Sequence, residues 1–385
     1  MTVSPATRRS LIVLSGIALL AAAVIYKGPR LLQLYYHHGL RLVPVATGLD
    51  TPWSLAFLPD GQMLVTERSG HLRLLAGDSH GGRGREISGL PPVWLNGGAG
   101  LLSVTIDPQF PANHLIYWSY VAPAPDGKAG SVAVARGRLE DATLQDVQVI
   151  LRDPEVVDTP AGFGSRLLFT QDGKLLVTLG DRDHRDDAQR LDSLHGKILR
   201  IEADGRIPAD NPFVGKPGAN PAIWALGFRD PQGLAIEPSV GRLWASDHGP
   251  LGGDEINLIL PGHNYGWPVV TYGVQEGTGA KIGEGTEKAG MDPPALWSGP
   301  DQGMPPTGMT FLTSDRYREW RGQLFVGTLW GQAMLRIGIA GTRAIDLQHI
   351  FTGRFQRVRD VQQGPDGWLY IVANEPDGAV IRLER

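Results

Sequence analysis

A strand–turn–strand unit recurs six times along this sequence, and it constrains the fold more than any other feature. In its clearest copies two apolar segments flank an Asp-Gly turn, as in residues 53–68, 166–181 and 358–372. The other copies begin near residues 101, 232 and 307. Asp-Gly between apolar runs indicates a β-hairpin, because glycine supplies the positive φ that the turn needs. Six copies predict radial repetition, so we expect an all-β fold, a six-bladed β-propeller.

A β-sandwich with coincidental spacing is the alternative, but a propeller closes the ring and leaves only short strand edges exposed. Residues 40–45 and 380–383 both have strand-like sequences, and we expect them to lie in the same, last blade. The 51 glycines and 29 prolines fit short strands and tight turns better than long helices. Segments 180–196 and 247–300 exceed ordinary loop lengths, and loops that long tend to carry function.

An uncharged apolar segment, residues 11–26, precedes the repeats. Arg8 and Arg9 come before it and Lys27 follows it. A basic stretch followed by an apolar one is typical of an export signal or signal-anchor. The sequence therefore predicts an N-terminal hydrophobic helix, a signal-anchor or export signal over 1–32 and the propeller over 33–385. We expect a periplasmic or otherwise extracytoplasmic location, with the chain anchored to the cytoplasmic membrane.

Composition narrows the possible partners and sites. The formal net charge is −4 and no run of basic residues stands out in the repeats, so a nucleic-acid partner is not expected. The chain contains no cysteine, which excludes disulfides, thiolate metal sites and cysteine nucleophiles.

Several segments resemble the soluble quinoprotein glucose and aldose sugar dehydrogenases, a family also described as glucose/sorbosone dehydrogenase-like. The resemblance runs in order from about residue 45 to the C-terminus. Its strongest matches are the segments 49–57, 180–182, 195–201, 208–213, 227–234, 248–250, 253–257, 264–268 and 357–361.

The resemblance implies an oxidoreductase that binds pyrroloquinoline quinone (PQQ) and calcium at one mouth of a six-bladed propeller. There a histidine takes the proton of an aldose C1 hydroxyl while hydride passes to the quinone. The quinone carries the redox chemistry and the protein supplies orientation and electrostatics. A small-molecule sugar or an anionic ligand is the implied partner; the electron acceptor is open.

The same resemblance assigns roles to particular residues. Arg229, Arg357 and Arg359 fall on cofactor-binding arginines, and guanidinium groups suit carboxylates. Gly249 and Pro250 fall where backbone carbonyls hold the cofactor's calcium, and so count as both cofactor and metal ligands. A second, structural calcium is implied for two further residues, Glu255 and Tyr265.

Other positions depart from the family pattern. The family's catalytic histidine is replaced by Gly162, its active-site glutamine by Gly98 and its cofactor-binding lysine by Trp330. Asp230 stands where the family has asparagine, and Leu251 where it has arginine. These departures predict weakened PQQ binding and little aldose oxidation, and predict that Gly162→His with Gly98→Gln raises the activity.

Three other histidines lie in the long loops. His248 adjoins Gly249 and is the one remaining candidate for the base, although a weak one. His184 lies in a charged run that is most simply a solvated loop, and His195 begins one of the family-like segments.

Two functions remain open on the sequence alone. One is a PQQ-dependent aldose dehydrogenase with an altered site. The other is a non-catalytic propeller that binds a carbohydrate, an anion or a protein, since fold alone does not decide function. A calcium-dependent propeller hydrolase would need an axial carboxylate cluster, for which no motif is present.

Overall fold

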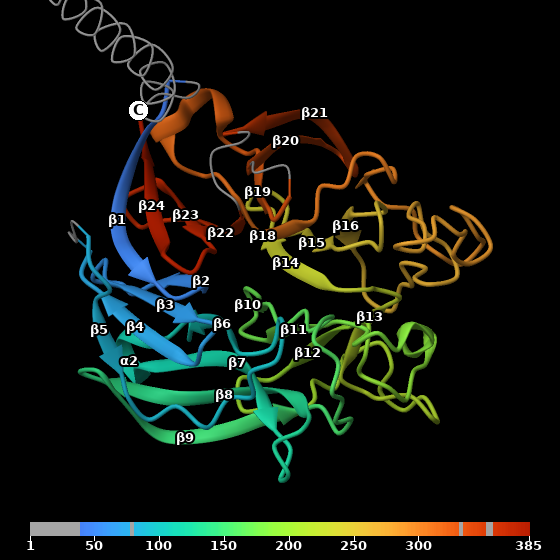
Figure 1. Ribbon diagram of the computed structural model, residues 1–385, viewed down its shortest axis with the longest axis horizontal. Helices are drawn as coiled ribbons and strands as arrows, with labels where there is room; N and C mark the ends of the chain where they lie inside the picture. The colour runs from blue at the N-terminus through green and yellow to red at the C-terminus, as the bar shows by residue number, and fades with distance from the viewer. Residues whose placement is uncertain (1–38, 78–80, 331–333, 352–356) are drawn as a thin grey trace, which may run out of the picture.

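Six four-stranded antiparallel sheets surround a central channel in the computed structural model (Figure 1). The structure describes residues 39–77, 81–330, 334–351 and 357–385. The innermost strands of the blades contact one another in a closed ring, in the order β2, β6, β10, β14, β18, β22 and back to β2. The predicted all-β six-bladed propeller is therefore confirmed.

The first three blades follow one another along the chain. Their strands, from the channel outward, are β2 (Pro52–Phe57), β3 (Met63–Glu67), β4 (His71–Leu75) and β5 (Arg85–Ile87); β6 (Leu101–Ile106), β7 (Leu115–Pro123), β8 (Gly130–Glu140) and β9 (Thr143–Arg152); and β10 (Leu167–Phe169), β11 (Leu175–Leu179), β12 (Lys197–Ile201) and β13 (Ile223–Leu226).

The last three blades complete the ring. Their strands are β14 (Pro231–Ile236), β15 (Leu243–Asp247), β16 (Glu255–Ile259) and β17 (Leu296–Trp297); β18 (Pro306–Phe311), β19 (Leu324–Thr328), β20 (Met334–Ala340) and β21 (Arg343–Ile350); and β22 (Val358–Gln363), β23 (Leu369–Ala373), β24 (Gly378–Glu384) and β1 (Arg41–Leu49).

The two ends of the described chain close the sixth blade. Strand β1 pairs antiparallel with β24, with Leu42 opposite Leu383 and Pro44 opposite Ile381. This pairing confirms the prediction that residues 40–45 and 380–383 share a blade. Because β24 also pairs with β23, one C-terminal strand joins the N-terminal strand to the rest of its sheet.

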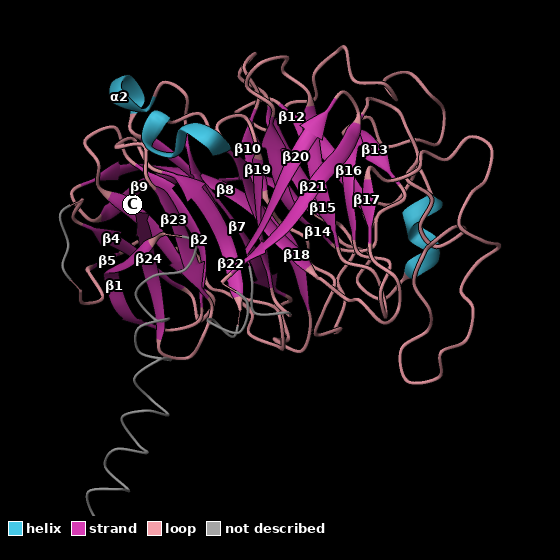
Figure 2. Ribbon diagram, turned by 90° about the horizontal axis from the view of Figure 1, so that it is seen from above, coloured by secondary structure: helices cyan, strands magenta, loops and turns pink. Residues whose placement is uncertain are grey.

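Apolar packing between neighbouring blades forms the core. Buried side chains of blades 2 and 3, among them Tyr117, Val177 and Leu199, belong to one cluster, and Trp244 packs with Phe311 between blades 4 and 5. Figure 2 shows the strands edge-on with loops at both ends of the channel. The helices are short and peripheral: α2 (Phe110–Asn113), η1 (Arg185–Gln189) and η2 (Asp315–Trp320).

Segment 247–300, expected to be irregular, contains two strands: β16, which pairs with β15, and β17, which pairs with β16 and has only two residues. The expected N-terminal hydrophobic helix lies outside the described residues. Among the residues that are described, no helix is long and apolar enough to cross a membrane.

Candidate functional site

All six inner strands begin at the same end of the channel, which we call the mouth. Hydrogen bonds between neighbouring inner strands place the starts of these strands at the same height along the channel. The Leu167 N–H donates to Ser103 Oγ (3.2 Å), and the Leu55 N–H donates to Asp360 Oδ2 (3.1 Å). Each of these residues lies within the first few positions of its strand. Residues that precede the inner strands, or that follow the second strands, therefore gather at the mouth.

Two of the three predicted cofactor-binding arginines are held by contacts at the mouth. Arg229 precedes β14, and its Nη1 donates to Gly249 O (2.7 Å). Arg359 lies in β22, and its Nη1 donates to Gln232 Oε1 (2.9 Å), while its buried Nε has no partner. Arg357, two residues earlier, is exposed and immediately precedes the same strand.

The arginines at the mouth form a cationic group in which some hydrogen-bond donors, such as Arg359 Nε, have no partner. Burial lowers the pKa of Arg359 to about 9; Asp230 opposes this shift, and the nearby charges of Arg357, Arg166 and Arg68 add to it. A guanidinium that is destabilised by burial and by three like charges favours an anion beside it. The mouth therefore has the electrostatics of an anion-binding site.

Asp230 and His248 form a buried pair that no spacing in the sequence indicates. Asp230 Oδ1 accepts hydrogen bonds from the Gly164 N–H (2.8 Å) and from Gln232 Nε2 (2.9 Å). Its Oδ2 lies 3.6 Å from His248 Nδ1. The opposite ring nitrogen, His248 Nε2, is buried and has no hydrogen-bond partner.

The charge of Asp230 is stabilised in this setting. Burial alone would raise its pKa, but the neighbouring His248, the Gly164 N–H and Arg229 outweigh burial and lower the pKa to about 2. Asp230 is therefore ionised at neutral pH, and its carboxylate favours an orientation of the His248 ring with Nδ1 toward it.

Carboxylates line the β15–β16 side of the mouth. Asp247 accepts hydrogen bonds from the N–H groups of Arg229 (2.9 Å) and Asp230 (2.7 Å), and it faces Glu255 across the ladder. Asp254 accepts from the Gly249 N–H (3.1 Å). Burial raises the pKa of Glu255 to about 7, and burial together with the charge of Glu255 raises that of Asp247 well above its usual value.

The structure brings only part of the predicted metal set together. Gly249 and Pro250 lie at the mouth beside Asp254, as expected, but the carbonyl of Gly249 accepts from Arg229. Tyr265 lies elsewhere: its hydroxyl donates to Leu258 O (2.6 Å) and accepts from the Leu260 N–H (2.8 Å), at the opposite end of β16 from Glu255. The Tyr265 hydroxyl is thus committed to a turn and does not reach Glu255.

The positions that depart from the family pattern also lie at this end. Gly162 has φ +70°, and a Cβ there would lie 2.8 Å from the Arg182 nitrogen. Gly98 donates its N–H to Pro160 O (2.6 Å). Trp330 is exposed and lines a cavity with Trp297 and with residues in and between the strands of blades 4 and 5. His184 is exposed, as predicted.

Comparison with known proteins identifies the family. The family model described as Glucose / Sorbosone dehydrogenase matches residues 49–382. The chain belongs to the glucose/sorbosone dehydrogenase family. Aldose sugar dehydrogenase YliI of Escherichia coli K12, a relative, is 40% identical over 340 residues, which is 87% of this chain and 90% of that protein. Quinoprotein glucose dehydrogenase B of Acinetobacter calcoaceticus is 32% identical over 59% of this chain and 52% of its own length.

Solved structures of the glucose/sorbosone dehydrogenase family have the same fold. The apo form of the soluble aldose sugar dehydrogenase from Escherichia coli superposes with a TM-score of 0.84 at 38% identity, covering 90% of this chain and 99% of that one. The PQQ-bound aldose sugar dehydrogenase from Streptomyces coelicolor gives a TM-score of 0.74 at 28% identity, covering 90% and 98%.

Proposed function

We propose that this protein is a PQQ-dependent aldose dehydrogenase in which His248, oriented by Asp230, acts as the base that is missing at Gly162. The observation that carries the proposal is the His248 ring, whose Nε2 is buried without a partner while Nδ1 faces an ionised carboxylate. The names of the relatives, an aldose sugar dehydrogenase and a PQQ-bound structure among them, support the reaction class.

The residues at the mouth suit the cofactor's acidic groups. Arg359 and Arg357, with Arg229 beside them, would hold the carboxylates of PQQ, and the unpartnered Nε of Arg359 is a donor that such an anion satisfies. The carbonyls of Gly249 and Pro250 would hold calcium once Arg229 turns from Gly249 toward the anion. When bound, PQQ supplies the hydride acceptor and calcium the Lewis acid.

The protein's own contribution is the handling of one proton. His248 Nε2 would accept the proton of the sugar C1 hydroxyl, and the Asp230 carboxylate would stabilise the imidazolium that forms. Asp230 stands where the family has asparagine, so its charge appears together with the loss of the usual base at Gly162. The two changes support a base moved from the β10 side of the mouth to the β15 side.

A reconstitution experiment tests this proposal. The purified protein is loaded with PQQ and Ca²⁺, and dye reduction is followed with a panel of aldoses. With His248 as the base we expect activity in the unmodified chain, in place of the little aldose oxidation that the departures from the family pattern predict. We expect His248→Asn to lower kcat/KM by roughly 10²–10⁴-fold, the usual contribution of a general base. PQQ absorbance retained by the variant would show that binding is intact.

Asp230→Asn tests the orienting role of the carboxylate. With its oxygen still accepting from the Gly164 N–H, the amide turns its NH2 group toward His248 Nδ1, so the proton of the neutral imidazole moves to Nε2 and the base is blocked. We expect kcat/KM to fall while PQQ absorbance is retained. No activity in the loaded wild-type protein would favour the non-catalytic binding propeller instead.

We further propose that the chain is exported and held at the cytoplasmic membrane by its N-terminal segment, with the propeller outside. The apolar run 11–26 and the preceding Arg8-Arg9 support this proposal. Fractionation of cells, followed by protease treatment of spheroplasts, should find the intact protein in the membrane fraction with its propeller accessible. Recovery of a soluble cytoplasmic form would contradict it.

A further inference from the structure

A second cluster of possible ligands lies outside the mouth, between blades 2 and 3. It consists of Glu155, Asp187 and His195, and a ligand atom from each lies within 4.8 Å of the others. Glu155 follows β9, Asp187 lies in η1, and His195 precedes β12. In the described part of the chain this is the one such group of three or more His, Asp or Glu side chains.

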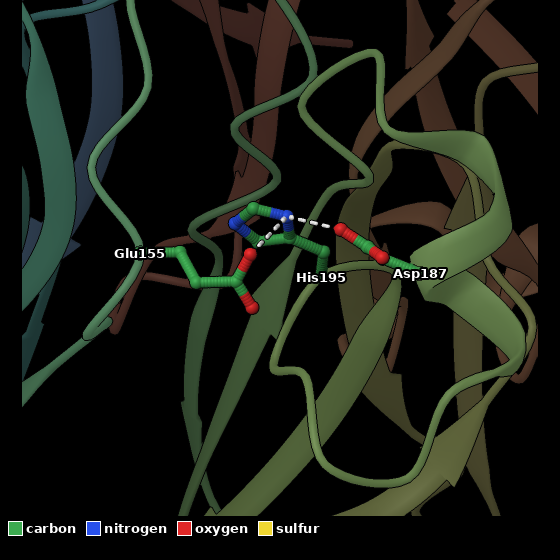
Figure 3. A group of neighbouring side chains, drawn as sticks. All are labelled: Glu155, Asp187 and His195. Carbon is green, nitrogen blue, oxygen red and sulfur yellow. Dashed lines mark ion pairs between the residues drawn. The ribbon is translucent and has the colours of Figure 1, made fainter.

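His195 lies at the centre of this cluster, and each of its two ring nitrogens faces at least one carboxylate. The side chain is completely buried, and Nε2 lies 3.0 Å from Oδ2 of Asp153, which is also fully buried. The other nitrogen, Nδ1, has no hydrogen-bond partner. Figure 3 shows the same ring nitrogen facing both carboxylates, 3.4 Å from Asp187 Oδ2 and 3.8 Å from Glu155 Oε2.

Both carboxylates are held by their other oxygen. Arg190 Nη1 donates to Asp187 Oδ1 (2.8 Å), and Ser193 Oγ donates to Glu155 Oε1 (2.8 Å). Asp187 Oδ2 and Glu155 Oε2 are therefore left facing the imidazole. A proton bridges these atoms poorly, because 3.4 and 3.8 Å exceed the ordinary N–H···O distance of about 2.7–3.2 Å.

The spacing suits a small divalent cation better than a proton. An ion about 2.0–2.2 Å from each ligand in a tetrahedral arrangement leaves the ligands roughly 3.3–3.6 Å apart. The Asp153–His195 contact is the outer-shell arrangement that orients a metal-bound histidine and fixes its tautomer. Imidazole with two carboxylates favours Zn²⁺ or a similar transition ion over Ca²⁺, which prefers oxygen ligands alone.

We propose that Glu155, Asp187 and His195 bind a zinc-like divalent ion that fastens the connection leaving blade 2 to blade 3. Water would complete the coordination from the side of Glu155, the only partly exposed ligand. The fastened connection, residues 153–166, leads to Gly162 and Phe163 at the mouth, so the ion would also order that side of the site. This inference is independent of the proposed activity.

Zinc titration of the full-length protein tests the inference without any activity assay. After chelator treatment and dialysis, calorimetry should find one equivalent of Zn²⁺ bound, with a rise in Tm. Glu155→Gln should lose this binding. Asp153→Asn should weaken it by roughly 10–100-fold, because only the outer-shell contact is altered. Glu202→Gln, an acidic residue of the same blade that pairs with Lys174, should bind as the wild type does.

Two further measurements keep the result decisive. Circular dichroism establishes that Glu155→Gln is folded, and the visible absorption of bound Co²⁺ in the wild type reports nitrogen–oxygen coordination directly. Excess Ca²⁺ should not displace Zn²⁺. The inference is overturned by the absence of stoichiometric Zn²⁺ binding, by equal binding in Glu155→Gln, or by displacement with Ca²⁺, which would indicate a general acidic patch.

Discussion

Gly162 lies against the backbone of Arg182, and this contact determines what the position can hold. The Arg182 N–H donates to Gly162 O, and the Arg182 guanidinium stacks 4.1 Å from the Phe163 ring centroid. Arg182 is buried, with Nε and Nη1 unpartnered, and burial lowers its pKa to about 10. A histidine at 162 would meet this backbone at its first side-chain atom, so our expectation that Gly162→His raises activity is not supported.

Gly162→Ala should destabilise the protein by about 1–3 kcal/mol. Its Cβ would combine a left-handed backbone (φ +70°) with a 2.8 Å approach to the Arg182 nitrogen. Gly173→Ala is the matched control, because φ there is +76° but nothing lies within 4 Å of the added atom. Urea unfolding should show the larger loss for Gly162→Ala; equal losses would mean that crowding contributes nothing.

At the scale of strands, Arg166 joins several blades across the channel. It comes just before β10, and its Nη1 donates to Asp360 Oδ2 of β22 (3.0 Å) and to Ser54 Oγ of β2 (3.2 Å), while Nε donates to Gln232 O (2.9 Å). Both charged partners are buried. Buried pairs of this kind contribute little net stability, but removing one partner leaves the other uncompensated.

Arg166→Met should therefore lower the free energy of unfolding by about 3–5 kcal/mol. The double variant Arg166→Met/Asp360→Asn should recover part of that loss, because no unpaired charge then remains in the channel. Denaturant unfolding of the two variants and the wild type measures both effects. A double variant less stable than Arg166→Met would show that Asp360 acts mainly through its backbone contacts, such as the Leu55 N–H.

The β15–β16 ladder predicts a pH-dependent stability. Burial raises the pKa of Glu255 to about 7, so the folded protein holds this proton more tightly than the unfolded chain does. The stabilisation that comes from keeping the Glu255 carboxyl neutral is fully present below about pH 4.5 and is lost as the pH rises through about 7. In chelator, Glu255→Gln should thus exceed the wild type in unfolding free energy by roughly 3 kcal/mol at pH 8, with a small difference at pH 4.5.

Calcium provides the second half of this measurement. If Glu255 is a calcium ligand, adding Ca²⁺ at pH 8 should raise the Tm of the wild type and leave that of Glu255→Gln unchanged. Glu276→Gln, at an exposed loop position, is the control and should follow the wild type throughout. A pH-independent difference between Glu255→Gln and the wild type would contradict the assigned burial effect.

For the whole molecule, closure of the ring depends on β24. Ending the chain at Asp377 removes the strand that pairs with both β1 and β23 and takes Val380 and Leu383 from the core. We expect no cooperative thermal transition. Removing Arg385 alone breaks its exposed pair with Glu319 and its contacts with the Tyr317 and Trp320 rings, so Tm should fall by a few degrees at most. A cooperative transition in the shorter chain would contradict closure by β24.

The sequence predicted the architecture well because its repeats are local. Asp-Gly turns and their flanking apolar runs lie within about fifteen residues, and the family pattern placed Gly162, Arg229 and Arg359 at one end of the channel, as observed. The remaining contacts join distant residues. Asp230 meets His248, and Glu155 meets His195 forty positions away; no spacing in the sequence indicates such pairs. The direction of the Tyr265 hydroxyl, toward Leu258 and Leu260, was likewise not visible in the sequence, and its role as a metal ligand stays a prediction.

The β1–β24 pairing also sets the order of events during synthesis. Arg41 and its partner Glu384 are 343 residues apart, and a ribosome adding about 5–20 residues per second needs roughly 20 to 70 seconds to make that length. Throughout this interval the first strand has an open edge with unsatisfied backbone groups, to which chaperones or other chains can attach. The backbone groups of β1 are therefore protected only after β24, the last strand to be synthesised, has been made.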